Sequence, residues 1–187
     1  MPKYGINDMP ELTSVKVGNK HVPHPRYRLW HNLMSRVHEP RVAHYFGLSI
    51  CEDWLTFSKF NAWVDEHFVE GYSLDKDILH EGNMCYGPEY CIFVPQWVNT
   101  IAITPNRKRD LPTGVYRNGK GYMAQLRKRA GNSTTVGTYS TPMLAYKAYL
   151  QAKGKYIKEL KVELDAIDIR LYPALFEKYR SLWLSCQ

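Results

Sequence analysis

Two carboxylates in one short segment and an amide further along the chain are of the types that bind divalent metal ions. Asp75 and Asp77 flank Lys76, and Asn99 follows 24 residues after Asp75. Carboxylate and amide oxygens are hard ligands suited to Mg²⁺, with phosphate and water in the remaining coordination positions. A metal ion held in this way could stabilise the leaving oxygen of a cleaved phosphodiester. The same pattern is common in surface loops, so by itself it leaves both interpretations open.

The charges of the chain are separated into blocks. The 187 residues carry a formal net charge of +7, with 25 Lys and Arg against 18 Asp and Glu. Residues 52–89 contain nine acids and two lysines, whereas residues 105–129 contain eight basic residues and one acid. The acidic block could hold a cation and the basic block a phosphate backbone, although both could instead be solvated faces.

Composition argues against several classes of protein. No apolar run approaches the roughly 20 residues that a membrane-spanning helix needs. The first residues lack the apolar segment of a secretory signal. The four Cys are scattered and include no Cys-x-x-Cys pair, which disfavours a disulfide scaffold and a structural zinc site. We therefore expect a soluble intracellular protein with reduced thiols.

The elements that must position the acidic residues follow from the spacing of apolar side chains. Helices are predicted between Pro25 and Pro40 and, with Thr56 or Ser58 as the cap, up to His67. Three further elements are expected in the order strand, strand, helix, at residues 71–79, 90–94 and 96–103. This order is the outline of a ββα unit, with Asp75 at the end of a strand and Asn99 on the helix.

The basic block is predicted to form a small sheet. Asn118-Gly119 is a strong hairpin signal between strands at residues 114–117 and 121–127, and residues 134–139 give a third strand. The leader, residues 1–24, is expected to be loose, with a short extended piece at Ser14–Val17.

Two helices are predicted after this sheet. Thr141 is expected to cap the first, with Pro142 at its first helical position. Apolar residues recur every four positions from Leu144 to Leu164, and we expect this face to be covered by the sheet. The last helix is expected around Tyr172–Leu184.

Three segments carry a resemblance to known families, roughly over residues 25–160. The central segment resembles the HNH endonuclease pattern of tailed-phage proteins, through Leu74-Asp75-Lys76-Asp77-Ile78-Leu79, Gly82-Asn83, Tyr86, Pro88, Cys91, Phe93-Val94-Pro95 and Asn99. The upstream segment resembles what precedes that motif in the same proteins, through Tyr27, Trp30, Leu33-Met34, Arg36, Tyr45, Cys51-Glu52-Asp53-Trp54-Leu55, Phe57, Phe60 and Trp63. The downstream segment resembles the APETALA or ethylene-response-factor type of DNA-binding domain, through Gly114-Val115, Lys120-Gly121-Tyr122, Ala124, Gly137, Tyr139 and Ala145-Tyr146.

The resemblance implies an α+β fold with two functional domains. A ββα-metal unit of the HNH (His-Me finger) type would precede a small three-stranded antiparallel sheet packed on one helix, with a helical C-terminal extension. The implied divisions are a leader (1–24), an HNH-like nuclease domain (25–104), a basic linker (105–112), a DNA-binding domain (113–160) and the extension (161–187).

The resemblance also implies a function. The expected activity is that of a metal-dependent endonuclease of the phage or homing type, which hydrolyses phosphodiester bonds of double-stranded DNA with Mg²⁺ or another divalent cation such as Mn²⁺. Such a protein would act in the cytoplasm of the infected bacterial host, as a monomer or weak homodimer, without a membrane partner. By position, Asp75 and Asn99 match the metal ligands, and Asn83 or Tyr86 lies near the central, structural Asn of the motif.

The sequence departs from the family pattern at the general base. Lys76 stands where the family has the first His, and its two flanking carboxylates favour the protonated form, which is a poor base. Its ammonium could contact phosphate or developing charge, or could simply pair with its neighbours. His80 and Asp77 are the other candidate bases. The predicted catalytic residues are Asp75, Lys76, Asp77, His80 and Asn99. A second hypothesis is a catalytically degenerate protein that uses the scaffold as a DNA-binding or regulatory module.

Basic residues on the predicted sheet and in the preceding linker are the predicted DNA contacts. We expect the sheet to lie in the major groove, where these side chains reach phosphates and base edges. The predicted set is Arg107, Lys108, Arg109, Arg117, Lys120, Tyr122, Arg127, Lys128 and Arg129. The alternative is a solvated basic hairpin, with Tyr122 packed in the core.

Overall fold

The computed structural model of the chain describes residues 4–39, 45–102 and 110–186. It confirms a mixed α+β fold with small sheets. The chain divides into two compact units, Met1–Asp77 with Gly82–Phe93, and Ile78–Glu81 with Val94–Gln187. Within the described ranges, no helix combines the length and the apolar character needed to cross a membrane.

The core of the first unit is an aromatic cluster between two helices. Helix α1 (Pro25–His38) and helix α2 (Phe57–His67) begin and end close to where apolar spacing predicts. The ring of Phe57 lies 5.3 Å from that of Trp30 between centroids. Trp30 is fully buried, and its indole N–H donates to the backbone oxygen of Trp54 at 2.7 Å. This hydrogen bond satisfies the one polar atom that the indole brings into the core.

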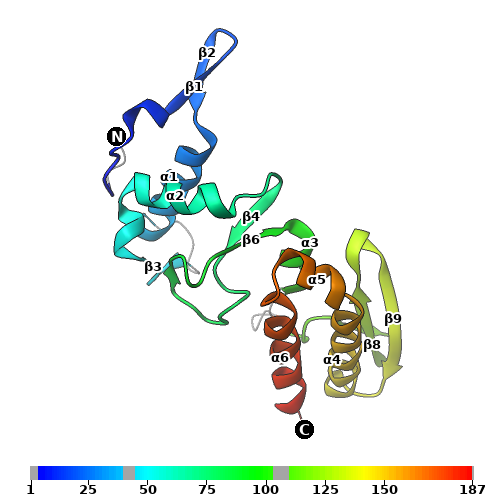
Figure 1. Cartoon of the computed structure of the whole chain (residues 1–187). Helices are drawn as coiled ribbons and strands as arrows, with labels where there is room; N and C mark the ends of the chain where they lie inside the picture. The colour runs from blue at the N-terminus through cyan, green and yellow to red at the C-terminus, as the bar shows by residue number, and fades with distance from the viewer. Residues whose placement is uncertain (1–3, 40–44, 103–109, 187) are drawn as a thin grey trace. The chain divides into compact units, whose positions relative to one another are not determined.

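A hairpin precedes α1 and projects from the first unit (Figure 1). Strands β1 (Ser14–Val17) and β2 (Lys20–Pro23) pair antiparallel around Gly18, whose φ of 60° favours glycine. The prediction of an extended piece at Ser14–Val17 is correct, but the pairing with residues 20–23 was not foreseen. Nearly every residue of the hairpin is exposed, so its sequence has no buried face and no alternation to reveal it.

The acidic segment contains short strands in the predicted order. Strand β4 (Tyr72–Asp75) pairs with β6 (Ile92–Pro95), which leads directly into helix α3 (Gln96–Ala102). The loop between them contains an additional strand, β5 (Cys85–Tyr86), which pairs parallel with β3 (Ser49–Ile50). Strand, loop, strand and helix thus follow one another as expected, while the specific ββα-metal geometry stays a prediction.

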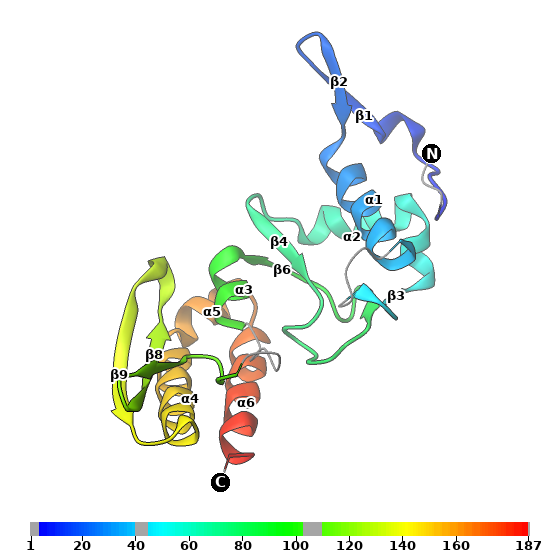
Figure 2. The ribbon, with the colours of Figure 1, turned by 180° about the vertical axis from the view of Figure 1, so that it is seen from behind.

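The second unit contains the predicted three-stranded antiparallel sheet. Strands β7 (Val115–Asn118), β8 (Gly121–Arg127) and β9 (Ser133–Tyr139) pair in this order. Helix α4 (Pro142–Glu159) packs against one face of the sheet, as Figure 2 shows. The small antiparallel sheet on one helix is therefore confirmed.

The C-terminal helices differ from the prediction in their boundaries and buried faces. Helix α4 ends at Glu159, and the chain continues as α5 (Lys161–Ile167) and α6 (Leu171–Leu184) instead of one helix through Leu164. Leu144, the first residue of the predicted apolar face, is 47% exposed. The prediction assumed that the sheet alone covers this helix, whereas α6 also packs along α4 (Figure 1).

Helix α3 belongs to the second unit, which moves the unit boundary away from the predicted one at residue 104. The Tyr179 hydroxyl of α6 donates to the backbone oxygen of Ile101 at 2.8 Å, and the Lys178 ammonium donates to that of Ala102 at 2.8 Å. The Arg129 guanidinium lies 4.6 Å from the ring centroid of Trp97. These contacts are long-range, so local spacing could not reveal them.

A buried lysine lies at the contact of α4 with α6. Lys153 is 4% exposed, and its ammonium lies 5.3 Å from the ring centroid of Tyr179. Burial, together with the nearby charge of Lys178, lowers the pKa of Lys153 from 10.5 to about 8. The folded protein holds this proton less tightly than the unfolded chain. The free-energy cost of burying the charged lysine is therefore at its full value below pH 8. This cost shrinks as pH rises from about 8 to 10.5.

Replacing this lysine should stabilise the second unit. We expect Lys153→Met to raise the free energy of unfolding at pH 7 by up to about 3 kcal/mol, because the cost of burying a charge is removed. The gain should diminish as pH rises from about 8 to 10.5, which urea unfolding at several pH values measures. Lys155→Met, an exposed lysine of the same helix, is the control. A gain that does not change with pH would contradict this account.

Candidate functional site

The loop after β4 is organised around a buried lysine. Lys76 is 8% exposed, and its ammonium lies 2.5 Å from a carboxylate oxygen of Asp77 and 2.8 Å from the backbone oxygen of Asn83. It also lies 5.7 Å from the ring centroid of Tyr86. The charge of Lys76 is thus compensated inside the loop, which favours the interpretation that it pairs with its neighbours over a role as base or phosphate contact.

The side chain of Asn83 forms hydrogen bonds with both ends of this loop. Its amide N–H₂ donates to the backbone oxygens of Lys76 at 3.1 Å and Cys85 at 2.6 Å. Its side-chain oxygen accepts from the backbone N–H of Cys85 at 3.0 Å. One side chain therefore joins the end of β4 to the start of β5.

The two predicted acids lie side by side in the first unit but in different surroundings. Asp75 is half-buried at the end of β4, and its Oδ1 accepts from the backbone N–H of Asp77 at 2.8 Å. Asp77 is exposed and holds the ammonium of Lys76. Asp75 is the carboxylate that the backbone fixes in place, whereas Asp77 compensates the lysine.

The other two predicted catalytic residues belong to the second unit. His80 is exposed on the segment Ile78–Glu81, which is fixed to α6 where the ammonium of Lys178 lies 3.6 Å from a carboxylate oxygen of Glu81. Asn99 lies on α3, and its side-chain oxygen is buried and accepts no hydrogen bond from the described part of the chain. A buried acceptor without a donor costs about 1–3 kcal/mol. It is therefore a candidate to bind a group from outside the chain.

The described residues contain no cluster of three or more His, Cys, Asp or Glu side chains that could hold a metal ion. The predicted ligand pair, Asp75 and Asn99, is one acid and one amide and is therefore not a cluster of this kind. Both supply hard oxygens, the chemistry that Mg²⁺ requires. The four cysteines are free, and burial raises the pKa of Cys91 to about 12, so that thiol is a poor metal ligand at neutral pH.

Three of the predicted DNA contacts lie on the exposed part of the sheet. Arg117 lies on β7, Lys120 in the hairpin turn and Arg127 at the end of β8, and all three are exposed. Tyr122 is half-buried, with the Arg117 guanidinium 5.8 Å from its ring centroid. Tyr122 thus supports an arginine instead of standing free on the surface. Arg107, Lys108 and Arg109 lie outside the described residues.

Two predicted DNA contacts are engaged with helices of their own unit. The Lys128 ammonium lies 5.1 Å from the ring centroid of Tyr156 and 3.8 Å from a carboxylate oxygen of Glu159. The Arg129 guanidinium forms an ion pair with Glu163 in addition to its contact with Trp97. Part of the positive charge in this block therefore serves packing of the unit, and Arg117, Lys120 and Arg127 are the better candidates for DNA.

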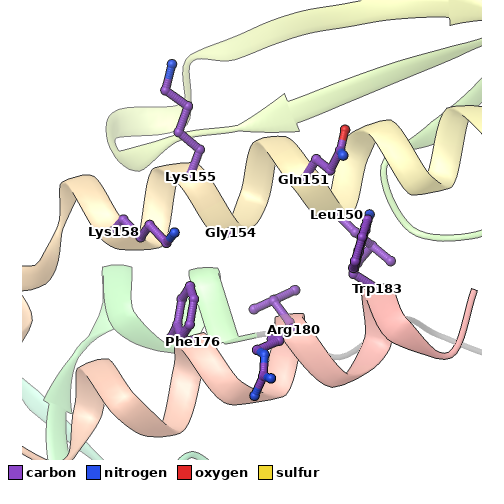
Figure 3. Close-up of a pocket in the computed structure, with 9 residues that line it drawn as sticks. Leu150, Gln151, Gly154, Lys155, Lys158, Phe176, Arg180 and Trp183 are labelled. Atoms are coloured by element: carbon purple, nitrogen blue, oxygen red, sulfur yellow. The ribbon is translucent and has the colours of Figure 1, made fainter. Parts of the chain in front are cut away.

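A groove of about 310 Å³ lies between α4 and α6 of the second unit (Figure 3). Phe176 points from α6 toward α4, whereas Arg180 points away from α4 and Lys155 points away from α6. The Lys158 ammonium lies 5.1 Å from the ring centroid of Phe176. The groove is mainly apolar and aromatic, and its position on the α6 side of α4 separates it from the exposed face of the sheet.

The structure also brings together basic side chains that the sequence analysis did not single out. Arg28 and Arg36 of α1 line a groove beside β4 of the same unit. The spacing of Arg28 and Arg36 in the sequence indicates this arrangement, because residues eight positions apart on a predicted helix lie on nearly the same face.

Comparison of the chain with protein-family models, curated protein sequences and solved structures finds no match. The HNH and DNA-binding interpretations therefore stay predictions from the sequence.

Removal of the Asn83 side chain tests whether its hydrogen bonds stabilise the loop. Asn83→Ala loses three hydrogen bonds, and we expect the free energy of unfolding to fall by about 2 kcal/mol. Proteolysis within residues 76–91 should be faster than in the unaltered protein. Asn132→Ala, at an exposed asparagine, should change stability by less than about 0.5 kcal/mol. Equal protease resistance of the two variants would show that Asn83 does not organise the loop.

Proposed function

We propose that the protein binds double-stranded DNA and hydrolyses its phosphodiester bonds with a divalent metal ion, Mg²⁺ or Mn²⁺, as an HNH-type endonuclease. The observation that carries the proposal is the buried side-chain oxygen of Asn99, which has no donor among the described residues. It occurs at the position to which the resemblance assigns a metal ligand. An ordinary structural asparagine would have its oxygen hydrogen-bonded in the fold.

The fixed carboxylate of Asp75 supports the same proposal. The backbone N–H of Asp77 holds one oxygen of Asp75 at 2.8 Å, so the carboxylate does not have to be ordered when a ligand binds. Asp75 and Asn99 would be the metal ligands, and the bound ion would stabilise negative charge on the leaving oxygen of the phosphodiester. Asn83 and Lys76 act through the loop and are positioning residues.

The proposed base is His80. Lys76 is held as a cation by Asp77 and the backbone oxygen of Asn83, and Asp77 is occupied in this pairing. An imidazole changes charge near neutral pH and can take a proton from water there. His80 is exposed, as a group that meets water must be.

The proposed DNA contacts are the exposed cations of the sheet. Arg117, Lys120 and Arg127 extend from two strands and a turn of the sheet that packs on α4. Each phosphate that such a cation neutralises releases counterions, so binding should weaken steeply with salt. Division of labour between metal-binding residues and a DNA-binding sheet would explain the separate acidic and basic blocks of the chain.

Nicking of a supercoiled plasmid tests the catalytic proposal. The unaltered protein should nick DNA in Mg²⁺ or Mn²⁺ and not in EDTA. Asp75→Asn and Asn99→Ala should lower the rate by about 100-fold or more, because loss of a metal ligand removes several kcal/mol of charge stabilisation. Both variants should also lose the rise in melting temperature that Mn²⁺ produces in the unaltered protein.

Two further substitutions are the matched controls for Asn99→Ala and Asp75→Asn. Thr100→Ala alters the next residue of α3, and Asp53→Asn removes an exposed carboxylate elsewhere in the first unit. Both should nick at the rate of the unaltered protein. If Asp75→Asn leaves the same nicking as the unaltered protein, the role of Asp75 is wrong.

A second candidate function is DNA binding without cleavage, which the burial of Lys76 favours. A cation fastened into the loop at the position of the expected base leaves the scaffold without its usual imidazole. In that case the protein would occupy or regulate DNA through its sheet.

Lys76→His separates the two candidates. A large gain of nicking from an inert protein would support the second candidate, because only the base was missing. Lys76→Met is the control for the lost loop contacts and should gain nothing. Robust nicking by the unaltered protein, measured on the same plasmid, would reject the second candidate.

A further inference from the structure

A basic groove lies between α1 and β4 in the first unit. Its volume is about 350 Å³. Side chains of α1 form one wall, and residues of β4 form the other. The described residues that line it are Pro25, Arg26, Arg28, Leu29, Asn32, Arg36, Phe68, Tyr72, Ser73, Leu74 and Phe93. Three of these are arginines and none is acidic, although the groove belongs to the unit that contains most of the acidic block.

The three arginines are not equivalent. Arg26 forms an ion pair with Asp65, so its charge is compensated within the unit. Arg28 is exposed and has no ion pair with a described residue. Arg36 is also exposed, and no carboxylate of the described chain forms a salt bridge with it. The uncompensated charge of the groove therefore comes from Arg28 and Arg36.

These two arginines and Asn32 form a row along α1. They are four residues apart, at positions 28, 32 and 36, so they lie on nearly the same face of the helix. Four residues advance an α-helix by about 6 Å. This interval is close to the separation of successive phosphates along a nucleic-acid strand. The row thus offers three donor side chains in the order that a backbone of phosphates would meet them.

Arg36 lies close to two tyrosines. Its guanidinium lies 5.8 Å from the ring centroid of Tyr45, and its charge also acts on Tyr86. Burial raises the pKa of Tyr86, so the phenol is neutral and does not cancel the arginine charge. An arginine fixed in this way loses little side-chain entropy when it binds an anion.

The floor of the groove is apolar. Leu29, Leu74 and Phe93 contribute the apolar surface. A cationic row above an apolar surface matches a sugar-phosphate backbone, which is charged at its phosphates and apolar at its sugars.

We propose that this groove binds the phosphate backbone of DNA, with Arg28, Asn32 and Arg36 as the contacting side chains. The inference rests on the proposed DNA-binding function and adds a second DNA contact, in the first unit, to that of the sheet. Its occupant is a continuous polyanion, since the donors form a row and not a single cluster.

Salt-dependent binding of the full chain to a fluorescent duplex tests this proposal. Arg28→Gln combined with Asn32→Ala should weaken binding severalfold and lower the slope of log affinity against log salt by about 1. Arg28→Glu should weaken it further. Lys59→Gln removes one positive charge from the same unit outside the groove and should leave affinity and slope unchanged. Arg36 is not altered, because its guanidinium also packs on the ring of Tyr45.

The outcomes distinguish the groove from the proposed function. A combined Arg117→Gln, Lys120→Gln and Arg127→Gln variant should lose affinity through the sheet. If this variant weakens binding while both Arg28 variants bind as the unaltered protein does, the groove proposal is wrong and the sheet proposal stands. If the unaltered protein does not bind duplex DNA at low salt, both are wrong. If Arg28→Glu weakens binding to single-stranded RNA but not to duplex DNA, the occupant is RNA and the proposal is overturned.

Discussion

The ammonium of Lys76 is the contact on which the loop after β4 depends. It bonds the carboxylate of Asp77 and the backbone oxygen of Asn83, and Asn83 in turn bonds the backbone on both sides of the loop. Asp77 also donates its backbone N–H to Asp75. A buried charge is costly unless it is paired and hydrogen-bonded, so these partners must assemble together. The position of Asp75 is therefore coupled to a lysine that never has to touch a ligand.

This arrangement places a structural demand and a chemical demand on the same position. The resemblance expects a base at residue 76, but a base must release and accept a proton within reach of water. Lys76 is almost fully buried, and its ammonium is bonded to Asp77 and to the backbone oxygen of Asn83. A residue that fastens the loop as a cation cannot also be neutral for catalysis. Any catalytic function must therefore obtain its base elsewhere, whereas a pure DNA-binding function needs none.

Elements with local signals could be predicted from the sequence, and elements that depend on distant contacts could not. The cap at Thr141 accepts from the Leu144 N–H at 3.2 Å, and the hairpin turn forms at Gly119-Lys120, one residue later than predicted, because both depend on a few adjacent residues. The end of α4, the exposure of Leu144 and the attachment of α3 to α6 depend on a second covering helix. In the candidate site, the residue types around Asp75 were predicted, but the inward direction of Lys76 is set by Asn83 and Tyr86 and was left open.

The net charge of a sequence segment differs from the charge that the folded protein exposes, because contacts with distant residues pair some of its cations. The block at residues 105–129 contains eight basic residues, yet Lys128 and Arg129 are engaged with Glu159, Glu163 and aromatic rings. Conversely, the arginines of α1 are few, but Arg28 and Arg36 lie in one row without acidic partners in the described chain. An ion pair inside the fold removes a cation from recognition, because a phosphate would have to displace its carboxylate. The number of uncompensated cations on one face is therefore a better guide to a polyanion site than the net charge of a segment.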